Sequence, residues 1–175
     1  IHSSKRALQG PSCHIACMDQ QTPFDRALLR QRRNRAATRY GDYDFLTAEV
    51  TDRLLDRLDD IKRPFADILN LGCHTGLAGE IMSARADTKF LVQSDLSDRM
   101  AGLAQNRNDL LTAILDEEAL PFAEESFDLI VSALTLHNVN DLPGALIQAN
   151  RCLRPDGVFL ASMFGGQTLV ELKEV

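Results

Sequence analysis

Short apolar runs alternate with amphipathic stretches along most of the chain. The runs at 67–71, 90–92, 112–115, 127–131 and 158–160 have the length of buried strands, and the segments between them have helical spacing or begin with helix-capping residues. Strands that alternate with helices indicate a parallel sheet built from strand–helix–strand units. The pattern therefore predicts an α/β fold with helices on both faces of a parallel sheet.

Two helices are expected before the first strand. Thr22-Pro23-Phe24-Asp25 has the features of a helix start, with Thr22 as the N-cap and proline at the first helical position. A second helix is expected over 44–60, where leucine or valine recurs every four residues at Leu46, Val50, Leu54 and Leu58. Later helices are expected after Gly76, over 98–105 with Ser97 as N-cap, over 142–153 with Asp141 as N-cap, and from Thr168 to Val175.

The first of these helices is strongly basic. Its arginines are Arg26, Arg30, Arg32, Arg33, Arg35 and Arg39, and Asp25 is its one acid. A solvated helical face explains such a segment without any function. The alternative is a cover over an acidic ligand, or a docking surface for an acidic partner.

The stretch 67–76 combines a buried strand, a short polar loop and the start of a helix. Gly72 can adopt a positive φ, and Gly76 allows the helix to pack close to the strand. Backbone N–H groups at a helix N-terminus can receive an anionic part of a ligand. His74 stands where a dinucleotide-binding fingerprint has its second glycine, so a strand–turn–helix without a ligand remains the alternative.

Polar residues follow the other predicted strands at the corresponding place. They are Asp95, the pair Asp116-Glu117, and the segment Ser132–His137. Ligands of parallel sheets bind at the carboxyl ends of the strands. Asp95 follows Gly72 by 23 residues, which is close to the roughly 20 residues expected for an acid that binds ribose hydroxyls. Together with Gly72–Gly76, these positions predict a ligand site at one edge of the sheet.

Composition excludes several classes of protein. The 175 residues are 45% hydrophobic and 25% charged, as in ordinary globular domains, and the net charge of −6 argues against broad nucleic-acid affinity. The sequence contains no run of about 18 apolar residues, so no transmembrane helix is expected. The scattered cysteines favour a reducing compartment, and Cys13-His14-x-x-Cys17 lacks the second Cys/His pair of a zinc site, so no metal is expected.

Five motifs in order along the chain resemble those of S-adenosylmethionine-dependent methyltransferases with the Rossmann-like fold. They are Leu69-Asn70-Leu71-Gly72-Cys73-His74-Thr75-Gly76, Asp95-Leu96-Ser97, Leu120-Pro121-Phe122, Ser126-Phe127-Asp128-Leu129-Ile130 and Leu153-Arg154-Pro155-Asp156-Gly157. The resemblance covers about 65–165 and implies a sheet that lacks the last strands of the family, because the chain stops after the fifth strand. The fold expected is thus a C-terminally truncated Rossmann-like methyltransferase sheet preceded by two N-terminal helices.

A narrower likeness is to the family of mitochondrial respiratory complex I assembly factor 5 and its bacterial relatives. It is carried by Phe24-Asp25-Arg26, Asp116-Glu117-Glu118, Asn140-Asp141-Leu142-Pro143 and Met163-Phe164-Gly165-Gly166-Gln167-Thr168-Leu169. That family is associated with hydroxylation of an arginine in a complex I subunit. The malonyl-acyl-carrier-protein methyltransferase of biotin synthesis has a related pattern.

The methyltransferase resemblance implies a role for each matching residue. The loop Gly72–Gly76, with Cys73 and His74, would hold the methionine end of the cofactor. Asp95 would bind both ribose hydroxyls, Leu96 would flank the adenine, and Asp116, with Glu117 beside it, would receive the adenine amino group. Ser132 and Leu134 would line the floor near the sulfonium, and His137 would be the candidate base. His137 is otherwise a packed or solvated loop histidine.

Two residues depart from the family pattern. Asn70 stands where aspartate is usual, so the amino group of the cofactor loses a charged partner. His74 stands where glycine is usual, and it either crowds the methionine portion or adopts a positive φ at modest cost. Cys73 is a reactive thiol or, as we favour, fills space against the helix. For Asp116, Glu117 and Glu118 we favour adenine recognition over acid/base work by paired carboxylates.

The predicted organisation has three parts: a leader or non-native segment at 1–18, an Arg-rich helical segment at 19–64, and a methyltransferase-like domain at 65–175 that is incomplete at its C-terminus. The first hypothesis is an S-adenosylmethionine-dependent methyltransferase acting on a protein or small molecule. The alternative is a complex I assembly factor with an arginine hydroxylase or partner-docking role, for which no His-x-Asp or His-x-Glu iron motif is present. The location expected is cytoplasmic in a bacterium, or the matrix side of the mitochondrial inner membrane in a eukaryote.

Overall fold

The computed structural model describes residues 22–166, 168 and 170 and contains a five-stranded parallel sheet. The strands are β1 Asp67–Leu71, β2 Phe90–Asp95, β3 Leu111–Ile114, β4 Phe127–Ala133 and β5 Leu153–Ser162. Their order is β3-β2-β1-β4-β5. The chain builds outward from β1 through β2 to β3 and then returns to the other side of β1 for β4. The strand order therefore reverses between β1 and β4, where α/β sheets bind ligands.

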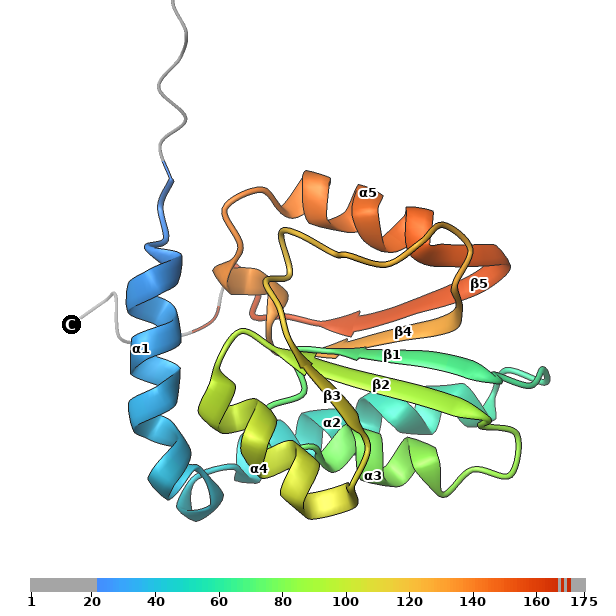
Figure 1. Cartoon of the computed structure of the whole chain (residues 1–175), viewed down its shortest axis with the longest axis horizontal. Helices are drawn as coiled ribbons and strands as arrows, with labels where there is room; N and C mark the ends of the chain where they lie inside the picture. The colour runs from blue at the N-terminus through green and yellow to red at the C-terminus, as the bar shows by residue number, and fades with distance from the viewer. Residues whose placement is uncertain (1–21, 167, 169, 171–175) are drawn as a thin grey trace, which may run out of the picture.

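Helices cover both faces of the sheet and its carboxyl edge (Figure 1). They are α1 Arg26–Ala36, α2 Phe45–Asp59, α3 Leu77–Ser83, α4 Asp98–Asn108 and α5 Leu142–Cys152, with short 3₁₀ turns η1 Ala37–Asp42 and η2 Leu136–Asn138. In Figure 1, α2, α3 and α4 lie on one face, α5 lies on the other, and α1 crosses the end at which the strands finish. The predicted α/β fold with helices on both faces is confirmed.

The alternation of side chains along β1 divides the core into two layers. Ile68 packs with Leu58, Met82 and other residues below the sheet, whereas Leu69 packs with Val139 and other residues on the α5 side. Such neighbours separate because successive side chains of a strand point to opposite faces. With both faces covered, the strands read as continuous apolar runs, which explains why they were visible in the sequence.

Most predicted element ends are correct, and two need correction. The side chains of Ser97 and Asp141 cap α4 and α5 as expected. The N-cap of α1 is Asp25 rather than Thr22, because the Asp25 carboxylate accepts the Leu28 N–H at 2.9 Å. The predicted turn at 154–157 lies inside β5 as an irregularity, since pairing with β4 jumps from Leu153 to Val158.

Some predictions fall on segments that the structure does not describe. The leader at 1–18, the Cys13–Cys17 pair and nearly all of the helix expected over 168–175 lie outside the described residues. Within the described part of the chain, no helix is long and apolar enough to cross a membrane. Leu46, expected on the buried face of α2, is 43% exposed.

Candidate functional site

The loop between β1 and α3 has a backbone that requires glycine at both ends. Gly72 has φ 75° and Gly76 has φ 86°. A Cβ on Gly72 would lie 2.2 Å from the Thr135 hydroxyl oxygen, and one on Gly76 would lie 2.9 Å from the Ala104 backbone. The predicted positive φ at Gly72 is confirmed. The close approach at Gly76 is to α4 rather than to the strand.

Most N–H groups of this loop already have partners in the protein. Gly72 and Cys73 both donate to the Ser94 carbonyl, at 2.8 and 2.7 Å, and Gly76 donates to the Cys73 carbonyl at 2.8 Å. The His74 N–H donates to the Asp95 carboxylate at 3.0 Å. The N–H groups of Gly72, Cys73 and His74 thus tie the loop to the end of β2, and that of Gly76 closes the turn, so these four are already paired within the protein.

His74 is a partly buried, neutral hydrogen-bonding ring. Its φ of 50° confirms that histidine occupies the left-handed region where the family has glycine. Nε2 lies 2.9 Å from the Ala133 carbonyl, which can only accept, so the proton is on Nε2. Nδ1 then accepts from the Tyr40 hydroxyl at 3.1 Å and from Arg33 at 3.2 Å. Burial, assisted by the Arg33 charge, lowers the pKa of His74 to about 4.

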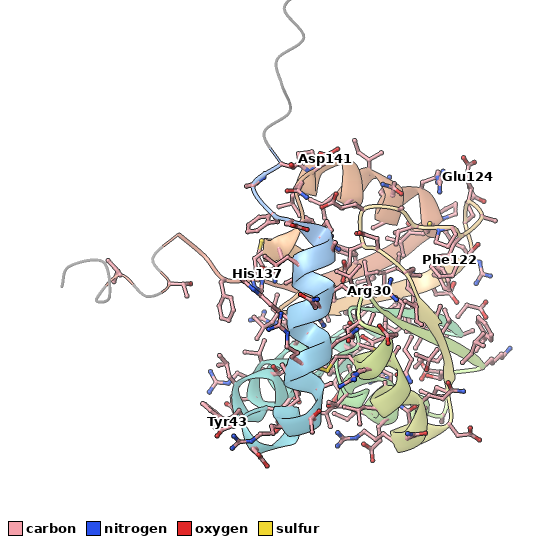
Figure 2. All side chains as sticks on the ribbon, turned by 60° about the vertical axis from the view of Figure 1, so that its left-hand side comes forward. Arg30, Tyr43, Phe122, Glu124, His137 and Asp141 are labelled. Carbon is pink, nitrogen blue, oxygen red and sulfur yellow. The ribbon has the colours of Figure 1, made fainter. Side chains whose placement is uncertain are left out.

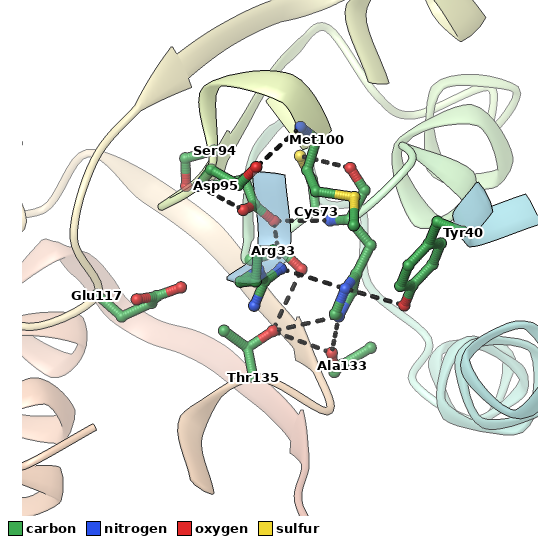
Figure 3. A network of polar contacts seen from close by, with 12 residues as sticks. Arg33, Tyr40, Cys73, Ser94, Asp95, Met100, Glu117, Ala133 and Thr135 are labelled. Carbon is green, nitrogen blue, oxygen red and sulfur yellow. Dashed lines mark hydrogen bonds and ion pairs between the residues drawn. The ribbon is translucent and has the colours of Figure 1, made fainter. Parts of the chain in front are cut away.

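Asp95 ends β2 with a carboxylate that has no exposed surface. One oxygen accepts the Ser97 N–H at 2.8 Å. The other accepts the His74 N–H at 3.0 Å and the Arg33 guanidinium at 2.6 Å (Figure 3). The carboxylate thus joins the start of α4, the glycine loop and α1.

A second ion-pair group lies where β3 ends. The Arg26 guanidinium donates to both carboxylate oxygens of Asp116, at 2.6 and 3.1 Å, and also to the Glu117 carboxylate. Its other terminal nitrogen donates to the Asn138 carbonyl at 3.0 Å. The Glu117 side chain is only 1% exposed, and burial raises its pKa in spite of the Arg26 charge.

The arginines of α1 divide into two sets. Arg26 and Arg33 turn inward onto carboxylates of the protein, whereas Arg32 and Arg35 are exposed. Figure 2 shows α1 across the front of this edge, with His137 beside it. The interpretation as a solvated face is therefore wrong for the inward pair. The helix is a cover, as the alternative had it, but the acids beneath it belong to the protein itself.

The other predicted cofactor residues are buried at the carboxyl ends of the strands. Asn70, Leu96, Ser132 and Leu134 are each no more than 9% exposed. Among the described residues, several buried polar atoms here have no hydrogen-bond partner: Asn70 Nδ2, Glu117 Oε1, Ser132 Oγ and His137 Nδ1. Beside the loop, a cavity of about 10 Å³, lined in part by Asn70, His74 and Tyr40, has room for about one water molecule. The site therefore has side-chain atoms that can form further hydrogen bonds, but the cavity beside them has little free volume.

Comparison with known proteins identifies the fold family. Residues 69–161 match the methyltransferase domain family. The chain belongs to this family. The matched residues run from within β1 to within β5 and include the glycine loop and Asp95, whereas α1 lies outside them.

The relatives of this methyltransferase domain include both enzyme types anticipated from the motifs. The human mitochondrial arginine-hydroxylase NDUFAF5 is 42% identical over 86% of this chain and 44% of its own length. A malonyl-[acyl-carrier protein] O-methyltransferase of Halorhodospira halophila is 33% identical over 86% of this chain and 52% of its own. The chain therefore spans about half the length of these curated relatives.

A solved structure supports the same fold. The N-methyltransferase NodS of Bradyrhizobium japonicum, in complex with S-adenosyl-L-homocysteine, superposes with a TM-score of 0.65 at 24% identity, over 75% of this chain and 71% of NodS. The predicted Rossmann-like methyltransferase fold is confirmed.

Cys73 and His137, the two residues considered for a chemical role, differ in how well their surroundings suit that role. Cys73 is 4% exposed, and burial raises the pKa of its thiol, so it fills space in the methyltransferase domain rather than reacting. His137 lies on η2, where its Nε2 is 3.2 Å from the Asn138 side chain. Burial and the Arg33 charge lower the pKa of His137, which keeps its ring neutral near neutral pH.

Sequence reasoning did not place Arg26, Arg33 or Tyr40 among the site residues. Their signal was present, because six arginines with a single acid are unusual for a helix that only faces solvent. The spacing of seven between Arg26 and Arg33 puts both on one face of α1, so both reach the sheet edge. Within the described residues, His, Cys, Asp and Glu side chains form no group of three or more suited to a metal ion.

Proposed function

We propose that this methyltransferase domain binds S-adenosylmethionine at the carboxyl ends of its strands and methylates a protein or small-molecule substrate. The observation that carries the proposal is the set of buried polar atoms without partners, which belong to Asn70, Ser132, Glu117 and His137. A buried polar group without a hydrogen bond costs about 1–3 kcal/mol, so folded proteins keep few of them. Their concentration at one sheet edge favours a polar ligand there.

The chemistry of these side chains matches the parts of this cofactor. Asp95 presents carboxylate oxygens, which can accept hydrogen bonds from two ribose hydroxyls. Glu117 Oε1 and the neighbouring Asp116 are acceptors for an adenine amino group, with Leu96 as the apolar neighbour. Asn70 and Ser132 would face the methionine portion from β1 and β4, and Leu134 would complete the floor.

In methyl transfer the cofactor supplies the reactive group, and the protein mainly orients the reactants. Bound S-adenosylmethionine supplies a methyl carbon that is attacked in line by a nucleophile. The residues of this chain orient the reactants, and a neutral His137 can accept the proton that the nucleophile releases.

A second candidate function is a role in complex I assembly, with arginine hydroxylation or partner docking on the same fold. The 42% identity to human NDUFAF5 favours it, since the aligned region includes most of this chain. Asn70 and His74, which depart from the methyltransferase pattern, leave room for it. A complex I subunit is the partner proposed in this case. The proposed location is the matrix side of the mitochondrial inner membrane if the source is eukaryotic and the cytoplasm if it is bacterial.

Calorimetric titration with S-adenosylmethionine and S-adenosylhomocysteine tests the binding proposal. We expect saturable binding that weakens at least about tenfold in Asp95→Asn, because a lost charged hydrogen bond is worth about 1.5–3 kcal/mol. Asp52→Asn, on the exposed side of α2, is the matched control. Melting curves of both variants separate loss of binding from loss of folding. Absence of binding at millimolar ligand would refute the proposal.

Mass spectrometry of substrates distinguishes the two candidate functions. Arginine-containing peptides and malonyl-acyl-carrier protein are incubated with the protein in two reactions, one with S-adenosylmethionine and one with dioxygen and a two-electron reductant. Addition of a methyl group with release of S-adenosylhomocysteine supports the methyltransferase, whereas addition of an oxygen atom to arginine supports the hydroxylase. Binding of a complex I subunit with neither product supports docking.

A further inference from the structure

Helix α1 is attached to the molecule by charges rather than by an apolar core. None of its residues, Arg26 to Ala36, is buried. Its inward contacts in the described structure are polar: they include the ion pairs of Arg26 and Arg33, and contacts of Arg30 and Asn34 with Asp98 at the start of α4. Apolar burial supplies most of the stability of docked helices, about 25 cal/mol per Å². A helix with little of it is expected to leave the surface more easily than the sheet unfolds.

The two inward arginines bind the same carboxylates that the proposed function assigns to the cofactor. Arg33 bonds Asp95, the acceptor for the ribose, and Arg26 bonds Asp116 and Glu117, the acceptors for the adenine. We infer that α1 and the cofactor compete for these carboxylates, so that α1 closes the site as an internal cationic occupant and must undock when the cofactor binds. The inference rests on the proposed function.

The hydrogen-bonding capacity of Asp95 makes the competition necessary. A carboxylate has about four acceptor positions. Three described donors use them: the Ser97 N–H, the His74 N–H and Arg33. The first two are backbone groups of the fixed framework, so Arg33 is the donor that can leave. Two ribose hydroxyls need two positions, and the second becomes available only when Arg33 withdraws.

The same reasoning applies to the other ion-pair group. Arg26 occupies both oxygens of Asp116 and one oxygen of Glu117, which leaves Glu117 Oε1 without a partner. The cavity of about 10 Å³ beside the loop is far smaller than the several hundred Å³ of ligand pockets. Undocking of α1 would free these acceptors and uncover the edge of the sheet that the helix crosses (Figure 1).

Removal of Arg33 should therefore tighten binding, which is the opposite of what a cofactor-binding residue would show. The affinity of a site that is open for only a fraction of the time falls by that fraction. Coupling between sites is commonly 5- to 150-fold, and we expect S-adenosylhomocysteine to bind Arg33→Ala about tenfold more tightly than the unaltered protein. Arg32→Ala removes an equal charge from the exposed side of the same helix and should leave the affinity unchanged.

Hydrogen exchange gives a readout that does not depend on activity. Saturation with S-adenosylhomocysteine should speed amide exchange in the peptide covering 26–36 while exchange in 67–76 slows. In Arg33→Ala the α1 peptide should exchange fast even without ligand. Because α1 buries no residue of its own and its undocking would expose the Asp95 carboxylate to water, this variant should keep the melting temperature of the sheet domain within a few degrees, and a melting curve checks that it is folded.

The outcomes separate the inference from the function on which it rests. If the protein binds ligand but Arg33→Ala binds no more tightly than Arg32→Ala, or if ligand slows exchange in α1, the competition is refuted and the proposed function stands. If neither variant nor the unaltered protein binds, the proposed function is refuted and the inference with it. Tighter binding in Arg33→Ala together with faster exchange in α1 supports both.

Discussion

Lowering the pH from about 7 to about 5 tests His74 as a neutral ring, because its protonation would break the hydrogen bonds around it. The Ala133 carbonyl accepts from Nε2, while Tyr40 and Arg33 donate to Nδ1. A proton on Nδ1 would face these two donors, and the charge would lie beside the Arg33 guanidinium. Burial and this neighbouring charge lower the pKa of His74 from 6.5 to about 4 in the folded protein.

The direction of the effect follows from the lowered value. Between pH 6.5 and about 4 the unfolded chain binds a proton at His74 and the folded protein does not. Stability from this residue is therefore complete above pH 6.5 and declines as the pH falls toward 4. At pH 5 the loss in the free energy of unfolding relative to pH 7 is about 2 kcal/mol. In urea titrations this moves the unfolding midpoint by about 1 M, since m is about 1–3 kcal/mol per M for small proteins.

The variant His74→Asn isolates this contribution. Asparagine tolerates the positive φ at this position and does not titrate. Other groups also respond to pH, because burial lowers the pKa of His137 and raises that of Glu117. Comparison of the pH dependence of the two proteins removes these shared effects. The pH-dependent loss should be about 2 kcal/mol smaller in His74→Asn, and equal losses in both proteins would refute the neutral His74 ring.

Three further predictions follow from the described contacts. Gly72→Ala should lower the melting temperature by about 10 °C in thermal unfolding, because positive φ and overlap with Thr135 together cost about 3 kcal/mol; an unchanged melting temperature would contradict the loop geometry. Asp141→Ala should cost about 1 kcal/mol through loss of the α5 cap, while Asp141→Asn retains the cap and the stability. Peptide mapping after iodoacetamide treatment should find Cys73 and Cys152 unlabelled until the protein is denatured, since both are buried.

The sheet was predictable because its strands are apolar on both faces and end in turn-forming or capping residues. Asp141 and Ser97 mark helix starts by local chemistry alone. Thr22 was the wrong cap because Asp25, three residues later, is an equally good capping residue, and the local pattern did not distinguish them. The jump inside β5 depends on pairing with β4, which no local pattern encodes.

The candidate site was predictable in position but not in its contacts. Asp95 and Glu117 were located by the rule that ligands meet the carboxyl ends of parallel strands. Their arginine partners lie 62 and 91 residues earlier, and ion pairs over such separations leave no periodic signal. The hydrogen bonds from the Gly72 and Cys73 N–H groups to the Ser94 carbonyl could not be predicted either, because every residue has a backbone carbonyl.

The position of Asp95 as a joint has a consequence for evolution. Its carboxylate fastens the glycine loop through His74 and the first turn of α4 through Ser97. Selection for a folded domain would therefore retain this acid in a descendant that had lost its cofactor. An acid at this place in a related sequence therefore indicates that the fold is retained. Whether the relative still binds the cofactor is better judged from residues such as Ser132, whose side-chain oxygen has no hydrogen-bond partner among the described residues.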